Sequence, residues 1–153
     1  NRSVPPLRYE DVHRLKAERP ELRVEINGGI TTLDEVLEHR EKVDGVMLGR
    51  AAIDNPFVFA AADRRVFGEE RAEAPTRREI GSRVVPYLAQ HLEAGGNPHH
   101  VLRHLLGLCA HRPGNKAWRR ALAEEVLRAD DPVSAFEGLL HRGDAAVLDE
   151  APL

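Results

Sequence analysis

Residues 22–50, LRVEINGGITTLDEVLEHREKVDGVMLGR, decide the fold of this chain. Two short apolar runs, 22–26 and 45–48, are each ended by glycine, and a segment with helical spacing lies between them. Thr32 and Glu35 have the spacing of a capping box, which predicts that a helix begins there. The stretch therefore predicts a strand, a helix and a second strand parallel to the first.

The elements on either side extend this pattern into a parallel α/β fold. Helical spacing at 9–19 precedes the first strand, and a further helix is predicted from Asn55-Pro56 to about Gly68. Residues 69–75 are charged, short of apolar groups and closed by a proline, so we interpret them as a linker. We expect residues 1–68 to form the α/β domain.

From Thr76 onward the pattern is helical only. Thr76 and Glu79 form a second capping box ahead of a helix in which Pro86 predicts a kink or break. Three more helices are predicted, at 99–110, 116–129 and 133–141. Because short turns join the four helices, we expect a small bundle over 76–144, followed by an unpatterned tail at 145–153.

Composition sets broad limits on function. The 153 residues suffice for one domain or two small ones, and 42% apolar with 31% charged residues is typical of a globular protein. No apolar run approaches the roughly 20 residues that span a bilayer, so no membrane is expected. The single cysteine, Cys109, can form no intrachain disulfide, which predicts a reducing, cytoplasmic location.

Glycines end both predicted strands at one edge of the sheet. Asn27, Gly28 and Gly29 follow the first strand, and Gly49 and Arg50 follow the second. Glycine lets backbone N–H groups approach a ligand closely, and Arg50 adds a forked, permanently charged donor. The pattern is typical of a phosphate site at the ends of parallel strands. The alternative is that these glycines only serve strand-to-helix turns.

Residues 94–123 contain no aspartate or glutamate, although the net charge of the chain is −3. This stretch holds the basic residues Arg103, Arg112, Lys116, Arg119 and Arg120 and the histidines His99, His100, His104 and His111. Arg103 with His104, and the group on 116–120, are predicted to present one positive face to nucleic-acid phosphates, with Trp118 stacking or packing nearby. The alternative is a solvated face with Trp118 in the core.

The sequence gives little support for a metal site or for a catalytic group of side chains. His100 and His104 are four residues apart, but no suitable carboxylate or thiolate completes a metal site, so no metal is expected. Cys109 lies among leucines, where thiols are usually buried and inert. No serine–histidine–aspartate grouping or carboxylate pair is apparent. We therefore assign no catalytic residue.

Motifs from both halves of the chain occur together in one known family. Those of the first half are Asn1-Arg2, Pro5-Pro6-Leu7, INGGI at 26–30, DGVMLGRA at 44–51 and Asn55-Pro56. Those of the second half are Arg103-His104, Leu106-Gly107-Leu108, Pro113-Gly114 and Trp118-Arg119-Arg120. In this order they resemble the tRNA-dihydrouridine synthases, most closely the A subfamily.

The resemblance implies a TIM barrel that holds FMN, followed by a helical tRNA-binding domain. In that family, reduced FMN gives hydride to a flipped-out uridine, a cysteine gives the proton, and NADPH re-reduces the flavin. The A subfamily forms 5,6-dihydrouridine in the D-loop of tRNA. Matched residue by residue, the resemblance assigns Asn27, Gly28 and Gly29 to one FMN-phosphate loop, Gly49 and Arg50 to the other, and Arg2 to tRNA.

The resemblance is to the last part of such an enzyme only. It covers the final two β/α units of the barrel and the helical domain, without the N-terminal barrel portion that carries the catalytic cysteine loop. Cys109 lies in the wrong domain to replace that cysteine. Because two strands cannot close an eight-stranded barrel, we expect the chain to need the missing portion as a partner and to be inactive alone.

Two alternatives stay open. The chain is a non-catalytic RNA-binding or assembly module if it never meets a portion with the cysteine loop. It is part of another flavin- or phosphate-binding TIM-barrel oxidoreductase if it binds FMN but not RNA. The motifs of the helical half argue against this second alternative.

Overall fold

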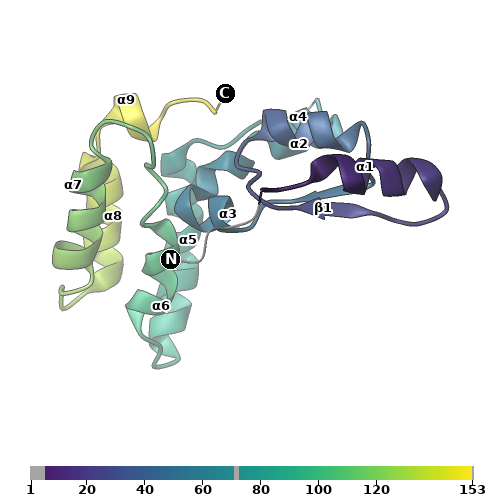
Figure 1. Ribbon diagram of the computed structural model, residues 1–153. Helices are drawn as coiled ribbons and strands as arrows, with labels where there is room; N and C mark the ends of the chain where they lie inside the picture. Colours follow the sequence, from purple (N-terminus) through teal and green to yellow (C-terminus); the bar gives the residue numbers. More distant parts are fainter. Residues whose placement is uncertain (1–5, 71–72, 153) are drawn as a thin grey trace.

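The computed structural model describes residues 6–70 and 73–152, most of which are helical (Figure 1). The first half comprises α1 (Tyr9–Glu18), β1 (Glu25–Asn27), α2 (Leu33–Arg40), β2 (Gly45–Met47), α3 (Arg50–Asp54), a 3₁₀-helix (Pro56–Phe59) and α4 (Ala62–Phe67). The second half comprises α5 (Arg77–Glu93), α6 (Pro98–Leu102), a 3₁₀-helix (Arg103–Leu105), α7 (Asn115–Arg120), a π-helical segment (Ala121–Val126), α8 (Pro132–Arg142) and α9 (Ala145–Leu148). This helix-rich chain with one small parallel sheet is consistent with part of a barrel followed by helices.

The strand–helix–strand prediction is confirmed. β1 and β2 pair in parallel, with Ile26 opposite Val46, and α2 connects them. The Thr32 hydroxyl accepts the Glu35 N–H, and the Glu35 carboxylate accepts the Thr32 N–H, so the predicted capping box starts α2. The first strand lies further along the chain than residues 22–26, because pairing to β2 begins only at residue 25.

One hydrophobic core lies between the sheet and its helices. Its buried side chains are Val24, Ile26, Ile30, Val36 and Val43. Tyr9 and Val12 of α1 and Val66 of α4 pack against them, so these helices cover one face of the sheet. On β2, Met47 is 53% exposed, which shows that the opposite face is open in this chain.

Asp44 ties the strands to α1. Its carboxylate accepts the Val24 N–H at 2.8 Å and pairs with the Lys16 ammonium at 2.9 Å. The bond from Lys16, followed by the backbone bond from Val24, lowers the pKa of Asp44. One carboxylate therefore holds the start of β1, the start of β2 and the end of α1 together.

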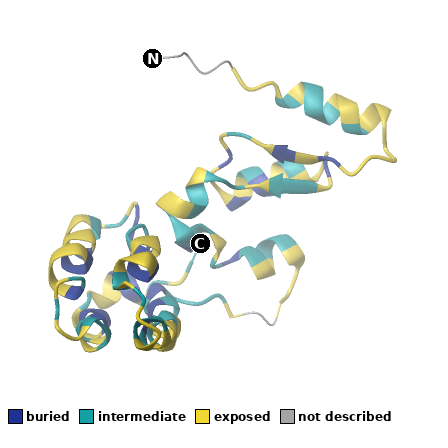
Figure 2. Cartoon of the chain, turned by 90° about the horizontal axis from the view of Figure 1, so that it is seen from below, coloured by how far each residue is buried: buried dark blue, intermediate teal, exposed yellow. Residues whose placement is uncertain are grey.

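A second core fills the helical half, where buried positions face one another between helices (Figure 2). Its most deeply buried side chains include Leu88, Leu102, Leu108, Leu122, Val126 and Phe136. Trp118 is also buried, and its indole N–H donates to the Leu105 carbonyl at 2.8 Å. Of the two alternatives for Trp118, stacking near the basic face or packing in the core, the structure confirms packing in the core.

Several predicted helices differ in extent from those observed. The helix predicted from Asn55 is two short pieces, a 3₁₀-helix and α4, and α3 precedes them. Gly68, in the left-handed conformation, caps the end of α4. The helix predicted at 99–110 stops after Leu102 and passes through a 3₁₀-helix into turns. The helix predicted at 116–129 changes to a π-helix after Arg120.

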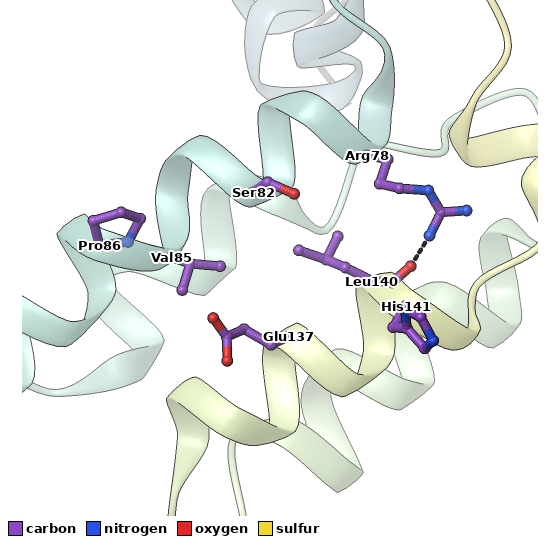
Figure 3. Close-up of a pocket in the computed structure, with 7 residues that line it drawn as sticks. All are labelled: Arg78, Ser82, Val85, Pro86, Glu137, Leu140 and His141. Atoms are coloured by element: carbon purple, nitrogen blue, oxygen red, sulfur yellow. Dashed lines mark hydrogen bonds between the residues drawn. The ribbon is translucent and has the colours of Figure 1, made fainter.

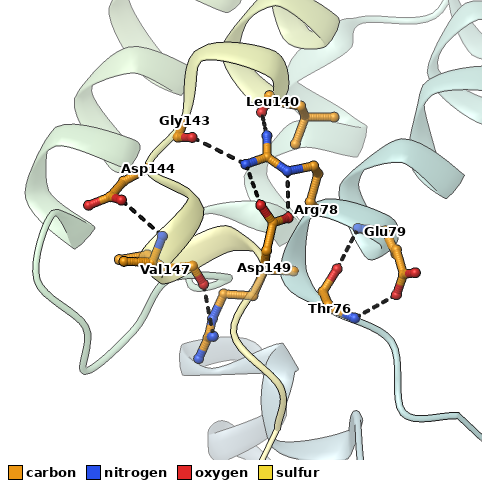
Figure 4. A network of polar contacts seen from close by, with 10 residues as sticks. Thr76, Arg78, Glu79, Leu140, Gly143, Asp144, Val147 and Asp149 are labelled. Atoms are coloured by element: carbon orange, nitrogen blue, oxygen red, sulfur yellow. Dashed lines mark hydrogen bonds and ion pairs between the residues drawn. The ribbon is translucent and has the colours of Figure 1, made fainter.

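Two further expectations need correction. Of the kink or break predicted at Pro86, the break does not occur, because α5 continues through this proline; the kink stays a prediction. The tail predicted to lack a pattern contains α9, which Asp144 caps by accepting the Ala146 N–H, and which buries Val147 and Leu148. The second capping box, between Thr76 and Glu79 at the start of α5, is confirmed (Figure 4).

In the helical half, α5 packs against α8 and the segment that follows it. Leu140 of α8 points toward α5 (Figure 3), and a Cβ added at Gly81 would lie 2.5 Å from its Cδ2. Arg78 donates to the Leu140 and Gly143 carbonyls and pairs with Asp149 at 2.6 Å (Figure 4). The segment after α8 is therefore held against α5 by packing and by ion pairing.

The two halves are in direct contact. Phe57, from the first half, is buried in the helical core, and the guanidinium of Arg77 lies 3.7 Å from the centre of its ring. Arg77 also donates to the carbonyls of Leu108 and Val147, at 3.0 and 3.2 Å. The start of α5 thus joins both halves. The linker at 69–75 stays a prediction, and two of its residues lie outside the described ranges.

Candidate phosphate-binding cleft and basic surface

The loops after β1 and β2 lie side by side and form one wall of a cleft of about 770 Å³. The five residues predicted to bind phosphate all line it, namely Asn27, Gly28, Gly29, Gly49 and Arg50. Parallel pairing places the ends of both strands at the same edge, which is why the two loops converge. The structure thus brings the predicted residues together; their binding of phosphate stays a prediction.

The glycine pair after β1 is required by the backbone. Gly28 and Gly29 have φ values of 129° and 67°, which other L-residues rarely adopt. A Cβ on Gly28 would lie 3.0 Å from Leu7, and one on Gly29 would lie 3.1 Å from the same side chain. The Tyr9 hydroxyl donates to the Gly28 carbonyl. The chain before and at the start of α1 therefore fixes the shape of this loop.

Gly49 and Arg50 supply the second loop. Nothing lies within 4 Å of a Cβ placed on Gly49, so the backbone is open to the cleft. Arg50 is exposed, and its guanidinium has no carboxylate partner in the part of the chain that the structure describes. An unpaired guanidinium beside exposed backbone suits an anion. Asp54, an acidic residue, also lines the cleft, so the residues that line it are not uniformly basic.

Asn55 and His111 are among the residues that line the cleft although the sequence did not assign them to it. Asn55 follows α3, and its side-chain oxygen is buried without a hydrogen-bond partner among the described residues. His111 comes from the turn before α7 and is the one non-glycine residue of the described chain with positive φ, at 61°. Asn55 was noted as a helix start and as part of a family motif, and His111 only as part of the basic stretch. Spacing carries no signal that the helical half reaches this cleft.

The predicted tRNA-binding residues of the helical half are exposed. Lys116, Arg119 and Arg120 lie on α7, and Arg103 and His104 on the 3₁₀-helix after α6. The Arg103 guanidinium approaches the His104 ring at 3.3 Å. The Trp118 bond to Leu105 ties the two segments together. Arg2, assigned to tRNA by resemblance, lies outside the described residues.

Arg112 belongs to a different arrangement from the exposed basic residues. Its guanidinium pairs with Glu150, which also pairs with Arg77 at 3.1 Å. A neighbouring cavity of about 390 Å³ is lined by these three residues together with His111 and Asn55. Arg112 therefore anchors the turn before α7 to the segment after α9, and its charge is already paired.

Cys109 is buried, as predicted, with 2% of its surface exposed. Burial raises the pKa of its thiol to about 11, and the nearby positive charge of Arg77 offsets only part of this effect. A protonated, buried thiol is a poor nucleophile. No three histidine, cysteine, aspartate or glutamate side chains of the described chain are placed to share a metal ion. Nor is any helix within the described ranges long and apolar enough to span a membrane.

Comparison of the sequence with known proteins places this chain in a family. The family model described as "Dihydrouridine synthase (Dus)" matches residues 1–141. A "tRNA-dihydrouridine(20/20a) synthase" of Pseudomonas aeruginosa is 46% identical over 140 residues, which are 92% of this chain and 42% of that protein. Proteins of the same name from a Synechocystis species and from Salmonella typhi are 45% and 39% identical, over 84% and 99% of this chain.

The chain spans about two fifths of the length of these relatives, since the matches cover 42%, 38% and 42% of them. The match includes both the α/β half with its cleft and the basic surface of the helical half.

Proposed function

This chain belongs to the dihydrouridine synthase family, and we propose that it is the C-terminal portion of a tRNA-dihydrouridine synthase. In this proposal the two strands are the last two β/α units of a TIM barrel, and residues 76–144 form the tRNA-binding domain. The open face of the sheet at Met47 supports the proposal, because in a barrel the inward-facing side chains of the other strands would cover that face. A cytoplasmic location follows from the tRNA substrate.

The cleft would hold the phosphate of FMN. Its glycine loops offer close backbone approach, and Arg50 adds an unpaired guanidinium, a donor set that fits a phosphate monoester. When bound, FMN supplies the hydride that reduces uridine, with NADPH as the source of electrons. This chain's residues would hold the phosphate end, while the proton donor belongs to the N-terminal barrel portion.

The helical half would position tRNA. Lys116, Arg119 and Arg120 on α7 and Arg103 beside His104 provide exposed positive charge for backbone phosphates. The reacting uridine must leave its stack to reach a flavin, so contacts to the backbone have to hold the RNA in place. The relatives' name points to positions 20 and 20a of tRNA, in the D-loop, as the uridines reduced.

The observation that carries this proposal is the convergence of both glycine loops and Arg50 on one cleft within a chain of this family. The test uses the full-length protein that contains this chain. We expect the purified protein to carry a flavin and to form dihydrouridine in unmodified tRNA when NADPH is supplied. Binding of tRNA without flavin would instead favour a non-catalytic RNA-binding module. Binding of FMN without tRNA would favour an oxidoreductase for small molecules.

A further inference from the structure

His111 belongs to the helical half but lies at its contact with the α/β half. It follows the turns after the 3₁₀-helix of the helical half, yet it lines the cleft formed by the loops after β1 and β2. It also lines the neighbouring cavity that holds Arg112 and Glu150. Among the described residues that line this cleft with Gly28 and Arg50, His111 is therefore the one that comes from the helical half.

The segment that carries His111 is anchored on both sides. The Leu108 carbonyl before it accepts the Nε–H of Arg77, and Arg112 after it pairs with Glu150. Gly107 packs so closely on α3 that a Cβ there would overlap the Asp54 carbonyl. The position of the His111 backbone is therefore fixed by contacts on both sides of it.

The backbone at His111 is unusual for a residue with a side chain. Its φ of 61° lies in the left-handed region, where glycine is accommodated without strain. Non-glycine residues in such conformations cluster at ligand sites, where the side chain is needed in spite of the strain. The His111 side chain is exposed, so burial in a core does not explain it.

We propose that His111 is a phosphate-contacting residue, through which the helical half completes the cleft. An imidazole has an N–H to donate whether neutral or protonated, and Arg50 faces the same cleft with a second donor. The ligand is a phosphate group, either the monoester of FMN or a phosphodiester of the tRNA backbone. This inference rests on the proposed function.

The test compares His111→Gly with the wild-type full-length enzyme. Glycine removes the imidazole and also relieves the strained φ, so the variant is expected to unfold at the same temperature as the wild type or higher. FMN affinity is measured on the deflavinated protein, and tRNA affinity on the flavin-loaded protein at fixed salt. We expect one of the two affinities to fall by about tenfold or more, as for one lost hydrogen bond to a charged group.

Which of the two affinities falls identifies the phosphate group that His111 contacts. Weaker FMN binding assigns the monoester, whereas weaker tRNA binding with unchanged FMN binding assigns the RNA backbone. His111→Asn keeps an N–H donor and tolerates positive φ, so it should recover part of the loss. His141→Ala removes an exposed imidazole on α8, outside the cleft (Figure 3), and should change neither affinity.

The proposal is overturned if folded His111→Gly binds FMN and tRNA as tightly as the wild type, because His111 is then only a turn residue. If the wild-type protein itself binds neither ligand, the proposed function is wrong and this inference falls with it. The wild-type measurement therefore separates failure of the function from failure of the residue assignment.

Discussion

At the scale of single residues, Gly107 decides how closely the two halves approach. It lies where the turns after the 3₁₀-helix meet the end of α3, and a Cβ there would overlap the backbone carbonyl of Asp54. A backbone atom cannot move aside as the tip of a side chain can. The contact between the halves, and with it the position of His111, depends on this glycine.

We expect Gly107→Ala to lower the free energy of unfolding by about 1–3 kcal/mol, the usual cost of overpacking. Gly138→Ala is the matched control, because its Cβ would meet only the end of Arg142 at 3.5 Å and alanine is favoured inside α8. Urea unfolding of both variants measures the difference. Equal stability of the Gly107→Ala variant and the wild type would show that the halves adjust without cost.

Arg50 is the residue most specific to the proposed cofactor. Arg50→Ala in the full-length enzyme should weaken FMN binding by about 1.5–3 kcal/mol, because one charge-assisted contact to phosphate is lost. Arg64→Ala, which removes an exposed arginine from α4, is the control. The measurement is titration of the deflavinated protein with FMN. Unchanged affinity would remove Arg50 from the site.

At the scale of elements, α7 presents its charges because its apolar side is fixed. Trp118 is buried and bonded to Leu105, so Arg119 and Arg120 are exposed. A helix held in this way presents a preformed positive surface. An exposed basic surface by itself binds RNA through phosphates and is weakened by salt.

The double variant Arg119→Ala, Arg120→Ala should lower tRNA affinity and make it less dependent on salt. Loss of each phosphate contact reduces the slope of log K against log salt concentration by roughly one. Arg83→Ala with Arg128→Ala removes two other exposed charges of the helical half and serves as the control. The two slopes are compared by titration at several salt concentrations. An unchanged slope in the α7 variant would leave that surface without a role in binding.

At the scale of the whole molecule, the segment after α8 ties the helical half together. Asp149 pairs with Arg78 of α5, and Glu150 pairs with Arg77 and Arg112 (Figure 4 shows the Arg78 pair). The hydrogen bond from Arg78 lowers the pKa of Asp149 below its ordinary value of 3.8. Because the folded state lowers this pKa, the ion pair stabilises the fold above pH 3.8 and is lost as the pH falls through the lowered value.

Asp149→Asn should therefore reduce the free energy of unfolding at pH 7, and the difference from the wild type should shrink as the pH falls below 3.8. Urea unfolding at pH 7 and at lower pH measures both differences. Asp130→Asn, at an exposed aspartate in the turn before α8, is the control. A difference that stays constant with pH would mean that the carboxylate charge of Asp149 does not contribute.

Short sequence patterns predicted those features of the fold that depend on residues close together in the chain. Thr32 with Glu35 and Thr76 with Glu79 start helices where their spacing indicates, because a capping box needs only four residues of chain. The parallel pairing of β1 and β2 and the burial of Cys109 also follow from short-range pattern. The ends of α6 at Leu102 and of α7 at Arg120 were missed, since the helical spacing of apolar residues continues past both positions.

The sequence by itself determined the strand–helix–strand unit, the edge at which Gly28, Gly29, Gly49 and Arg50 meet, and the exposed charges of α7. These features depend on alternation, capping and turn chemistry within a few residues. Only the tertiary structure decided that Trp118 is buried, that Arg77 joins both halves, and that His111 reaches the cleft. Such contacts join residues far apart in the chain, and their geometry follows from close packing of the two cores, which no local pattern records.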